Sequence, residues 1–205
     1  MLAADFLHLE KDVELVNNYA DIFHLDIMDG TFVPNISYGF PIVEAIAKIA
    51  RKPLDAHLMI VHPEKYVDRF AKAGVQMLSF HLNAVDNAGQ VLAQIRAAGM
   101  SPGLAINPDI PVEKLFPYLD QCDYVVLMSV FAGFGGQKFI EATYDRLAAV
   151  KAEVERQGVS CHIQVDGGVS AANSGKLAEL GADILVAGSA VFKADDPAAV
   201  IAAMR

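Results

Sequence analysis

The chain has 205 residues, of which 54% are hydrophobic and 20% charged, and its net charge is −9. This length supports one sizeable domain that buries roughly 70% of its unfolded surface, and the composition excludes a disordered chain. The acidic balance argues against nucleic acid or an anionic membrane surface as the main partner, because both attract basic proteins. No apolar run reaches the ~18 residues of a membrane span. No secretory signal is visible either, so we expect a cytoplasmic protein.

Short apolar segments alternate along the chain with longer amphipathic ones. The apolar segments predict seven strands, at residues 22–27, 54–60, 77–82, 103–106, 124–130, 162–165 and 184–187. Residues 2–4 would supply an eighth strand, at the start of the chain. The amphipathic segments predict helices at residues 7–19, 40–47, 63–70, 88–98, 112–119, 140–156, 171–180 and 197–204.

This alternation predicts the fold class. Near-continuous apolar strands joined by helices are typical of a parallel sheet covered by helices. Eight such units predict a single α/β domain over residues 1–205, a (β/α)8 TIM barrel. An open, doubly wound sheet is the alternative. No linker, low-complexity segment or block of charge divides the chain.

In a barrel, functional residues gather at the carboxyl ends of the strands. The strand at residues 22–27 carries His24 and Asp26, which are two residues apart and therefore point to the same face. Burying such a pair is costly unless the two groups are paired, metal-bound or catalytic, and both a structural pair and a functional one stay open. His81, on the strand at residues 77–82, is either a structural histidine or a ligand contact.

A candidate metal set combines two imidazoles and two carboxylates from three strand ends: His24, Asp26, His57 and Asp166. Asp55 shares a strand face with His57 by the same two-residue spacing. The set suits Zn²⁺, and also Fe²⁺, Mn²⁺ or Co²⁺. A metal there would act as a Lewis acid on a carbonyl oxygen. Spacing alone does not show that the four side chains converge.

Glycine-bearing turns follow three consecutive strand ends. The candidate phosphate-binding residues in them are Gly133, Phe134, Gly135, Gly136, Gly167, Gly168, Gly188 and Ser189. Glycines let backbone N–H groups approach an anion closely, and phosphate sites built by the last loops recur in this fold. The loop at residues 131–137 also has the glycines of a mobile lid.

Three of the seven methionines lie at strand ends, namely Met28, Met59 and Met128. Methionine is most often a flexible filler of the core. The gathering of three at one rim supports a second interpretation, in which they form an apolar wall of the substrate pocket.

Several motifs follow one another in a characteristic order: Ala4–Phe6 (ADF), His24–Gly30 (HLDIMDG), Asp55–Met59 (DAHLM), Leu127–Val130 (LMSV), Gly133–Phe139 (GFGGQKF), Val165–Gly168 (VDGG) and Ala187–Ala190 (AGSA). In these motifs the chain resembles the ribulose-phosphate 3-epimerase family over essentially its whole length. The resemblance implies a ribulose-phosphate-binding (β/α)8 barrel that interconverts D-ribulose 5-phosphate and D-xylulose 5-phosphate. It also implies a homo-oligomer.

The resemblance assigns roles to the candidate residues. It implies that the set of two histidines and two aspartates binds one divalent metal ion, with Asp26 and Asp166 as the acid and base. Two bases are needed because the proton leaves carbon 3 from one face of a planar enediolate and returns to the other. The resemblance further implies that the three methionines are the family's methionine wall and that the glycine turns bind phosphate.

Two positions depart from the family pattern. The family has a Pro-Ser-(Ile/Leu)-Leu-Ser run entering the first strand, and its substrate-contacting serine has no counterpart beside Met1-Leu2-Ala3-Ala4. In the lid, Phe131-Ala132 stands where the family usually has a proline before Gly-Phe-Gly-Gly. The loss of that proline predicts a looser lid.

Three alternative functions stay open. Allulose-6-phosphate 3-epimerase is a close relative with the same metal set. A lyase of the orotidylate decarboxylase or hexulose-phosphate synthase type uses an Asp-x-Lys-x-x-Asp strand, but the matching positions here hold His24, Asp26 and Asp29, with no lysine. A non-catalytic barrel that binds sugar phosphates would not need four metal-ligating side chains.

Overall fold

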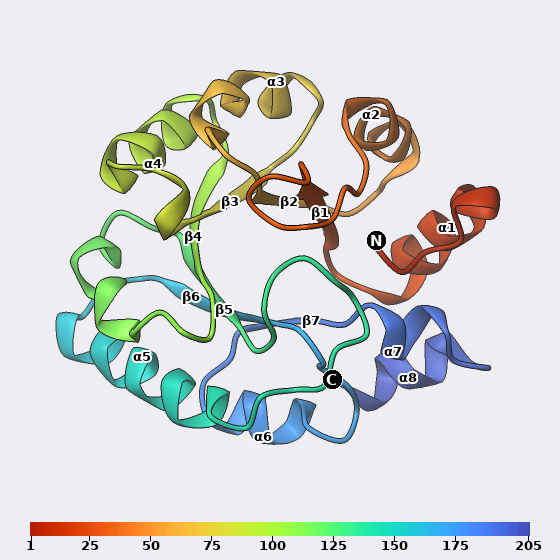
Figure 1. The fold of residues 1–205 in the computed structure, drawn as a ribbon. Coiled ribbons are helices and arrows are strands. Elements are labelled where there is room, and N and C mark those ends of the chain that lie inside the picture. The colour runs from red at the N-terminus through yellow and green to blue at the C-terminus, as the bar shows by residue number, and fades with distance from the viewer.

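The computed structural model describes residues 1–205. Seven parallel strands form one sheet in the order of the sequence: β1 (Phe23–Met28), β2 (Leu54–Met59), β3 (Met77–His81), β4 (Ser101–Ile106), β5 (Tyr124–Met128), β6 (His162–Asp166) and β7 (Ile184–Val186). The α-helices are α1 (Leu9–Tyr19), α2 (Phe40–Ile49), α3 (Val67–Lys72), α4 (Ala88–Ala97), α5 (Thr143–Gln157), α6 (Ser174–Glu179), α7 (Ser189–Phe192) and α8 (Pro197–Ala203). Figure 1 shows the sheet curled around a centre, with the helices outside it. None of these helices has the length and hydropathy of a membrane span.

The prediction of a strand at residues 2–4 is wrong, so the sheet has seven strands where eight were predicted. The Ala4 N–H donates to the Met1 carbonyl at 3.0 Å, which closes a turn instead of extending the backbone. The Met1 amino group donates a hydrogen bond of 2.6 Å to the His24 carbonyl of β1. The sheet is therefore an open curled barrel wall, with β1 and β7 as its edges.

Two predicted helices also differ in kind. Residues 112–119 form two 3₁₀ turns, Val112–Lys114 and Phe116–Tyr118, instead of one α-helix. Pro117 lies in the second turn, and a proline removes a backbone donor and disfavours α-helical geometry at the residue before it. The helix predicted at residues 63–70 begins as a 3₁₀ turn, Pro63–Lys65, and is α-helical from Val67 on, as part of α3.

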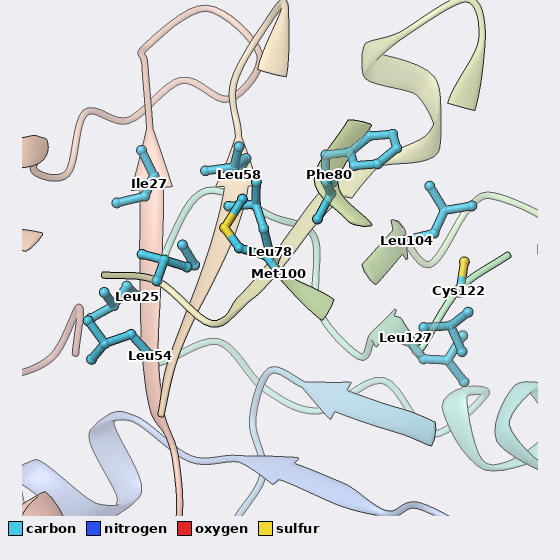
Figure 2. Close-up of a cluster of buried hydrophobic side chains, with 14 of the residues drawn as sticks. Leu25, Ile27, Leu54, Leu58, Leu78, Phe80, Met100, Leu104, Cys122 and Leu127 are labelled. Atoms are coloured by element: carbon cyan, nitrogen blue, oxygen red, sulfur yellow. The ribbon is translucent and has the colours of Figure 1, made fainter. Parts of the chain in front are cut away.

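The outer face of the sheet is apolar and packs against the helices. A cluster of 39 buried hydrophobic residues fills this layer. Leu25 and Ile27 of β1 and Leu58 of β2 belong to it, and Figure 2 shows them beside one another. Fully burying one such side chain stabilises the fold by roughly 1.5–3 kcal/mol. This layer therefore holds the strands in place.

The inner face of the first two strands is mostly polar. Because side chains alternate along a strand, the residues between those of the outer layer point into the barrel. The strand register sets them in three tiers, from mid-strand to the carboxyl end: His24 beside Asp55, Asp26 beside His57, and Met28 beside Met59. The sheet thus stacks two polar tiers under a tier of methionine at the mouth.

Candidate active site

Four polar side chains from three strands meet at the mouth of the barrel wall: His24 and Asp26 of β1, His57 of β2 and Asp166 of β6. One nitrogen or oxygen atom from each lies within 4.8 Å of those of the others. The four side chains are buried or nearly so. The structure therefore brings together the whole candidate metal set, which the sequence spreads over more than half of the chain.

The distances in this cluster suit a metal ion. His24 Nε2 lies 3.4 Å from Asp26 Oδ1 and 3.5 Å from Asp166 Oδ2. His57 Nδ1 lies 3.5 Å from Asp166 Oδ2 and 3.9 Å from Asp26 Oδ1. A tetrahedral Zn²⁺ with bonds of about 2.0–2.1 Å spaces its ligand atoms by roughly 3.3–3.4 Å. His24 Nε2 and His57 Nδ1 are buried without a hydrogen-bond partner, as free ligand atoms would be.

The charges of the cluster favour a cation. Burial by itself lowers the pKa of His24, but the carboxylates of Asp26 and Asp55 outweigh it and hold that pKa well above its usual range. Burial by itself raises the pKa of Asp166, but hydrogen bonds and positive charge from His24 and His57 hold it below its usual range. The site therefore attracts a positive charge, either as a proton on His24 or as a metal ion.

A second polar tier, which the sequence did not assign to the site, lies beneath the cluster. Asp55 is 1% exposed and accepts hydrogen bonds from His24 Nδ1 at 2.7 Å, Tyr124 Oη at 2.6 Å and Gln164 Nε2 at 3.0 Å. Burial raises the pKa of Asp55, but His24 and these hydrogen bonds outweigh it and lower the pKa. Two-residue spacing is the signal that was available, because Gln164 precedes Asp166 as Asp55 precedes His57.

His81 contacts a candidate ligand residue. Its Nε2 lies 3.0 Å from Nε2 of His57, and the two rings are stacked. Burial, followed by the nearby charge of His57, lowers the pKa of His81 well below its usual range. A neutral His81 can accept the Nε2–H of His57, which leaves His57 Nδ1 free to face the cluster.

A cavity of about 460 Å³ opens beside the cluster and reaches all the other candidate residues. Its lining includes the three methionines and the predicted phosphate-binding turns: Met28, Met59, Met128, Gly133, Phe134, Gly135, Gly136, Gly167, Gly168, Gly188 and Ser189. At Gly168 the backbone φ is +62°, and a Cβ atom would lie 2.7 Å from the Phe139 nitrogen. Glycine is therefore required where this turn meets the segment after the lid.

Comparisons with known proteins identify the family. The model of the ribulose-phosphate 3 epimerase family matches residues 1–192. The chain belongs to this family. A ribulose-phosphate 3-epimerase of Mycobacterium tuberculosis strain H37Rv is 42% identical over 205 residues, which are 100% of this chain and 89% of the relative. One from Synechocystis sp. is 44% identical, with coverage of 100% and 90%, and one from Bacillus subtilis strain 168 is 41% identical, with coverage of 100% and 95%.

Solved structures show the same fold at lower identity. A 3-hexulose-6-phosphate synthase has a TM-score of 0.69 and 22% identity, covering 98% of this chain and 95% of that one. A mutant tryptophan synthase alpha-subunit from Pyrococcus furiosus has a TM-score of 0.73 and 17% identity, with coverage of 98% and 92%. At this identity the likeness concerns the fold alone.

Hydrogen bonds with two neighbouring loops anchor the loop that is predicted to be the family's lid. The Ala132 N–H donates to Asn107 Oδ1 at 3.1 Å, and Asn35 Nδ2 donates to the Gly133 carbonyl at 2.9 Å. Within the loop, Gln137 Nε2 donates to the carbonyls of Phe131 and Phe134. Proline has no N–H and could not make the first of these bonds. The looser lid stays a prediction, and the bond to Asn107 opposes it.

Proposed function

We propose that this chain is a metal-dependent isomerase, an epimerase that interconverts D-ribulose 5-phosphate and D-xylulose 5-phosphate. The observation that carries the proposal is the meeting of two carboxylates from different strands, Asp26 and Asp166, around a pair of buried histidines. Family membership supports the substrate, because the relatives are named ribulose-phosphate 3-epimerase. The partner is therefore a small sugar phosphate.

Asp26 and Asp166 are the base and acid that remove the proton at carbon 3 and return one to it. Epimerisation removes the proton next to the carbon 2 ketone and returns one to the opposite face of the planar enediolate. A single base reaches only one face, so the reaction needs a group on each side. Asp26 Oδ1 and Asp166 Oδ2 lie 3.4 and 3.5 Å from His24 Nε2, and the two side chains project from different strands. One accepts a proton while the other donates, and the roles reverse with the direction of reaction.

The residues that would hold the metal are the two histidines and two aspartates of the cluster. One divalent ion suits these two nitrogen and two oxygen donors, with Zn²⁺ preferred over Fe²⁺, Mn²⁺ or Co²⁺. When bound, the ion supplies Lewis-acid stabilisation of the negative charge that develops on the substrate's oxygens. His24 and His57 would contribute neutral nitrogen ligands, so the two aspartates would supply all the negative charge of the ligand set.

The remaining candidates bind and enclose the substrate. The turns at residues 133–136, 167–168 and 188–189 offer backbone N–H groups to the phosphate. A Cβ placed on Gly136 would lie 3.9 Å from Ser189 Oγ, so turns after two different strands border one space. Met28, Met59 and Met128 form an apolar wall that keeps water from the reacting carbon.

We also propose that the working protein is a closed (β/α)8 barrel. The edges β1 and β7 are both parallel strands, and the cavity continues between them, lined by Phe23 and Ile184. In a closed barrel neither of these edges stays unpaired. Slow amide hydrogen exchange along both edge strands would support closure, and exchange as fast as in exposed loops would contradict it.

The experiment that tests the function supplies purified protein with D-ribulose 5-phosphate and, separately, with D-allulose 6-phosphate. Both reactions are repeated after exhaustive metal removal and after Zn²⁺ is restored. We expect turnover of the pentose phosphate that disappears with the metal and returns with it. Comparable turnover without metal would refute metal assistance, and preference for the hexose phosphate would refute the proposed substrate. If neither sugar reacted, the epimerase proposal would fail.

A further inference from the structure

A buried carboxylate lies behind one of the candidate metal ligands. Asp55 Oδ2 contacts His24 at Nδ1, whereas Nε2 of the same ring faces Asp26 and Asp166. Asp55 is outside the set of side chains whose donor atoms converge. Its contact with His24 therefore affects the cluster only through the imidazole ring.

Asp55 is held from three directions. Besides His24 on β1, Tyr124 on β5 donates its hydroxyl to Oδ1 at 2.6 Å, and Gln164 on β6 donates Nε2 to Oδ2 at 3.0 Å. Tyr124 is 1% exposed and Gln164 is fully buried, so no water competes for these bonds. Hydrogen bonds from three strands fix the orientation of the Asp55 carboxylate. The carboxylate in turn holds the His24 ring in one orientation.

A glycine on the neighbouring strand β4 leaves space for the ring of Tyr124. The register of β4 and β5 places Gly103 opposite Tyr124. A Cβ atom on Gly103 would collide with the far carbons of the Tyr124 ring, which explains why the position is glycine although its backbone needs no positive φ. The ring lies across β4 in this gap and brings its hydroxyl to Asp55.

We propose that Asp55, held by Tyr124 and Gln164, is a positioning residue that fixes His24 as the Nδ1–H tautomer, with Nε2 presented to the metal. The proposal rests on the metal site of the proposed function. A carboxylate that accepts the second N–H of a histidine ligand sets its tautomer and raises its basicity, and losing such a partner typically weakens metal binding by about 10–100-fold. Tyr124 acts one step further from the metal, through Asp55.

The test titrates Co²⁺ into metal-free protein and follows its visible absorption, which reports both affinity and coordination geometry. We expect Asp55→Asn to bind Co²⁺ about 10–100-fold more weakly than the parent, and Tyr124→Phe to show a smaller loss. Long-range ¹H–¹⁵N spectra of the Zn²⁺-loaded proteins report the His24 tautomer. The parent should carry its proton on Nδ1, and both variants should show a mixed population or an altered Nδ1 shift.

Two matched variants separate positioning from stability. Tyr66→Phe removes the same oxygen from an exposed ring, and Leu25→Ala destabilises the outer layer without touching the inner face. Both should keep the parent's Co²⁺ affinity and spectrum. If Asp55→Asn fails to fold, Tyr124→Phe carries the test. Unchanged affinity and tautomer in the folded variants would overturn the positioning role, whereas failure of the parent itself to bind Co²⁺ would overturn the metal site.

Discussion

The two faces of β1 differ sharply in what they contribute. Leu25 and Ile27 point outward into the large apolar cluster, whereas His24 and Asp26 point inward and lie buried among other ionisable groups. Outward burial stabilises the fold, but burying charged groups costs stability unless they are paired or bound to a metal. Within one six-residue strand, the outward-facing residues stabilise the fold and the inward-facing residues form part of the candidate site.

The largest effect is expected when a carboxylate on the inner face of the sheet is replaced. We expect Asp26→Asn and Asp166→Asn each to lose turnover by about 10²–10⁴-fold, because each removes one of two required proton-transfer groups. Steady-state assays with the metal content of each variant checked would measure this. Binding of a phosphate-bearing substrate analogue should survive. A variant within tenfold of the parent's turnover would rule out the two-base scheme.

The converse change truncates an outer residue. Leu25 is fully buried, and Leu25→Ala should lower the free energy of unfolding by about 2–5 kcal/mol. Turnover at temperatures where the variant stays folded should match the parent, because the side chain faces away from the site. Urea unfolding measures the stability. Leu7→Ala, at a position 90% exposed, is the control and should change little. A large loss of turnover in folded Leu25→Ala would contradict the claim that outer-face residues stabilise the fold without affecting the site.

A smaller effect is expected at the glycine turns. Gly168→Ala places a Cβ against the Phe139 backbone at a positive φ, which costs roughly 1–2 kcal/mol and shifts the turn. If the turn holds phosphate, KM should rise about tenfold with a smaller change in kcat. Gly175→Ala is the matched control, because its Cβ meets nothing within 4 Å and α6 tolerates alanine. Equal KM values for the two variants would remove this turn from the phosphate site.

The smallest predicted effect concerns the lid. Asn107→Ala removes the acceptor of the Ala132 N–H, and one such hydrogen bond contributes about 0.5–1.5 kcal/mol. We expect KM to rise about two- to tenfold, with the stability of the protein nearly unchanged. Substrate-dependent kinetics would measure the rise. An unchanged KM would mean that this bond does not restrain the loop.

The alternation of inward-facing and outward-facing side chains along a strand also explains what could be predicted from the sequence. The alternation of residues in β1 and β2 indicates which side chains share a face, so the sequence places His24, Asp26 and His57 in one candidate site, and the structure brings them together. The contacts of Asp55 with Tyr124 and Gln164 were not, because they depend on how strands far apart in sequence face each other across the barrel. Strand register and curvature come from the packing of the whole outer layer, which periodicity alone does not specify.

The predicted elements failed where local geometry outweighed periodicity. Residues 112–119 have a helical pattern, but Pro117 limits them to short 3₁₀ turns. Residues 2–4 have a strand-like composition, but a turn between Met1 and Ala4 replaces the ladder that would define a strand. Apolar composition identifies buried segments better than it identifies their backbone conformation.

The most direct test of the central claim follows the carbon 3 proton by NMR in D₂O. The parent protein should convert D-ribulose 5-phosphate to D-xylulose 5-phosphate that carries deuterium at carbon 3. Asp26→Asn and Asp166→Asn should each stop epimerisation yet still exchange that proton in one epimer, and in opposite epimers, because each variant keeps a base on one face only. Exchange of the same epimer by both variants, or formation of both epimers by either, would contradict two bases on opposite faces.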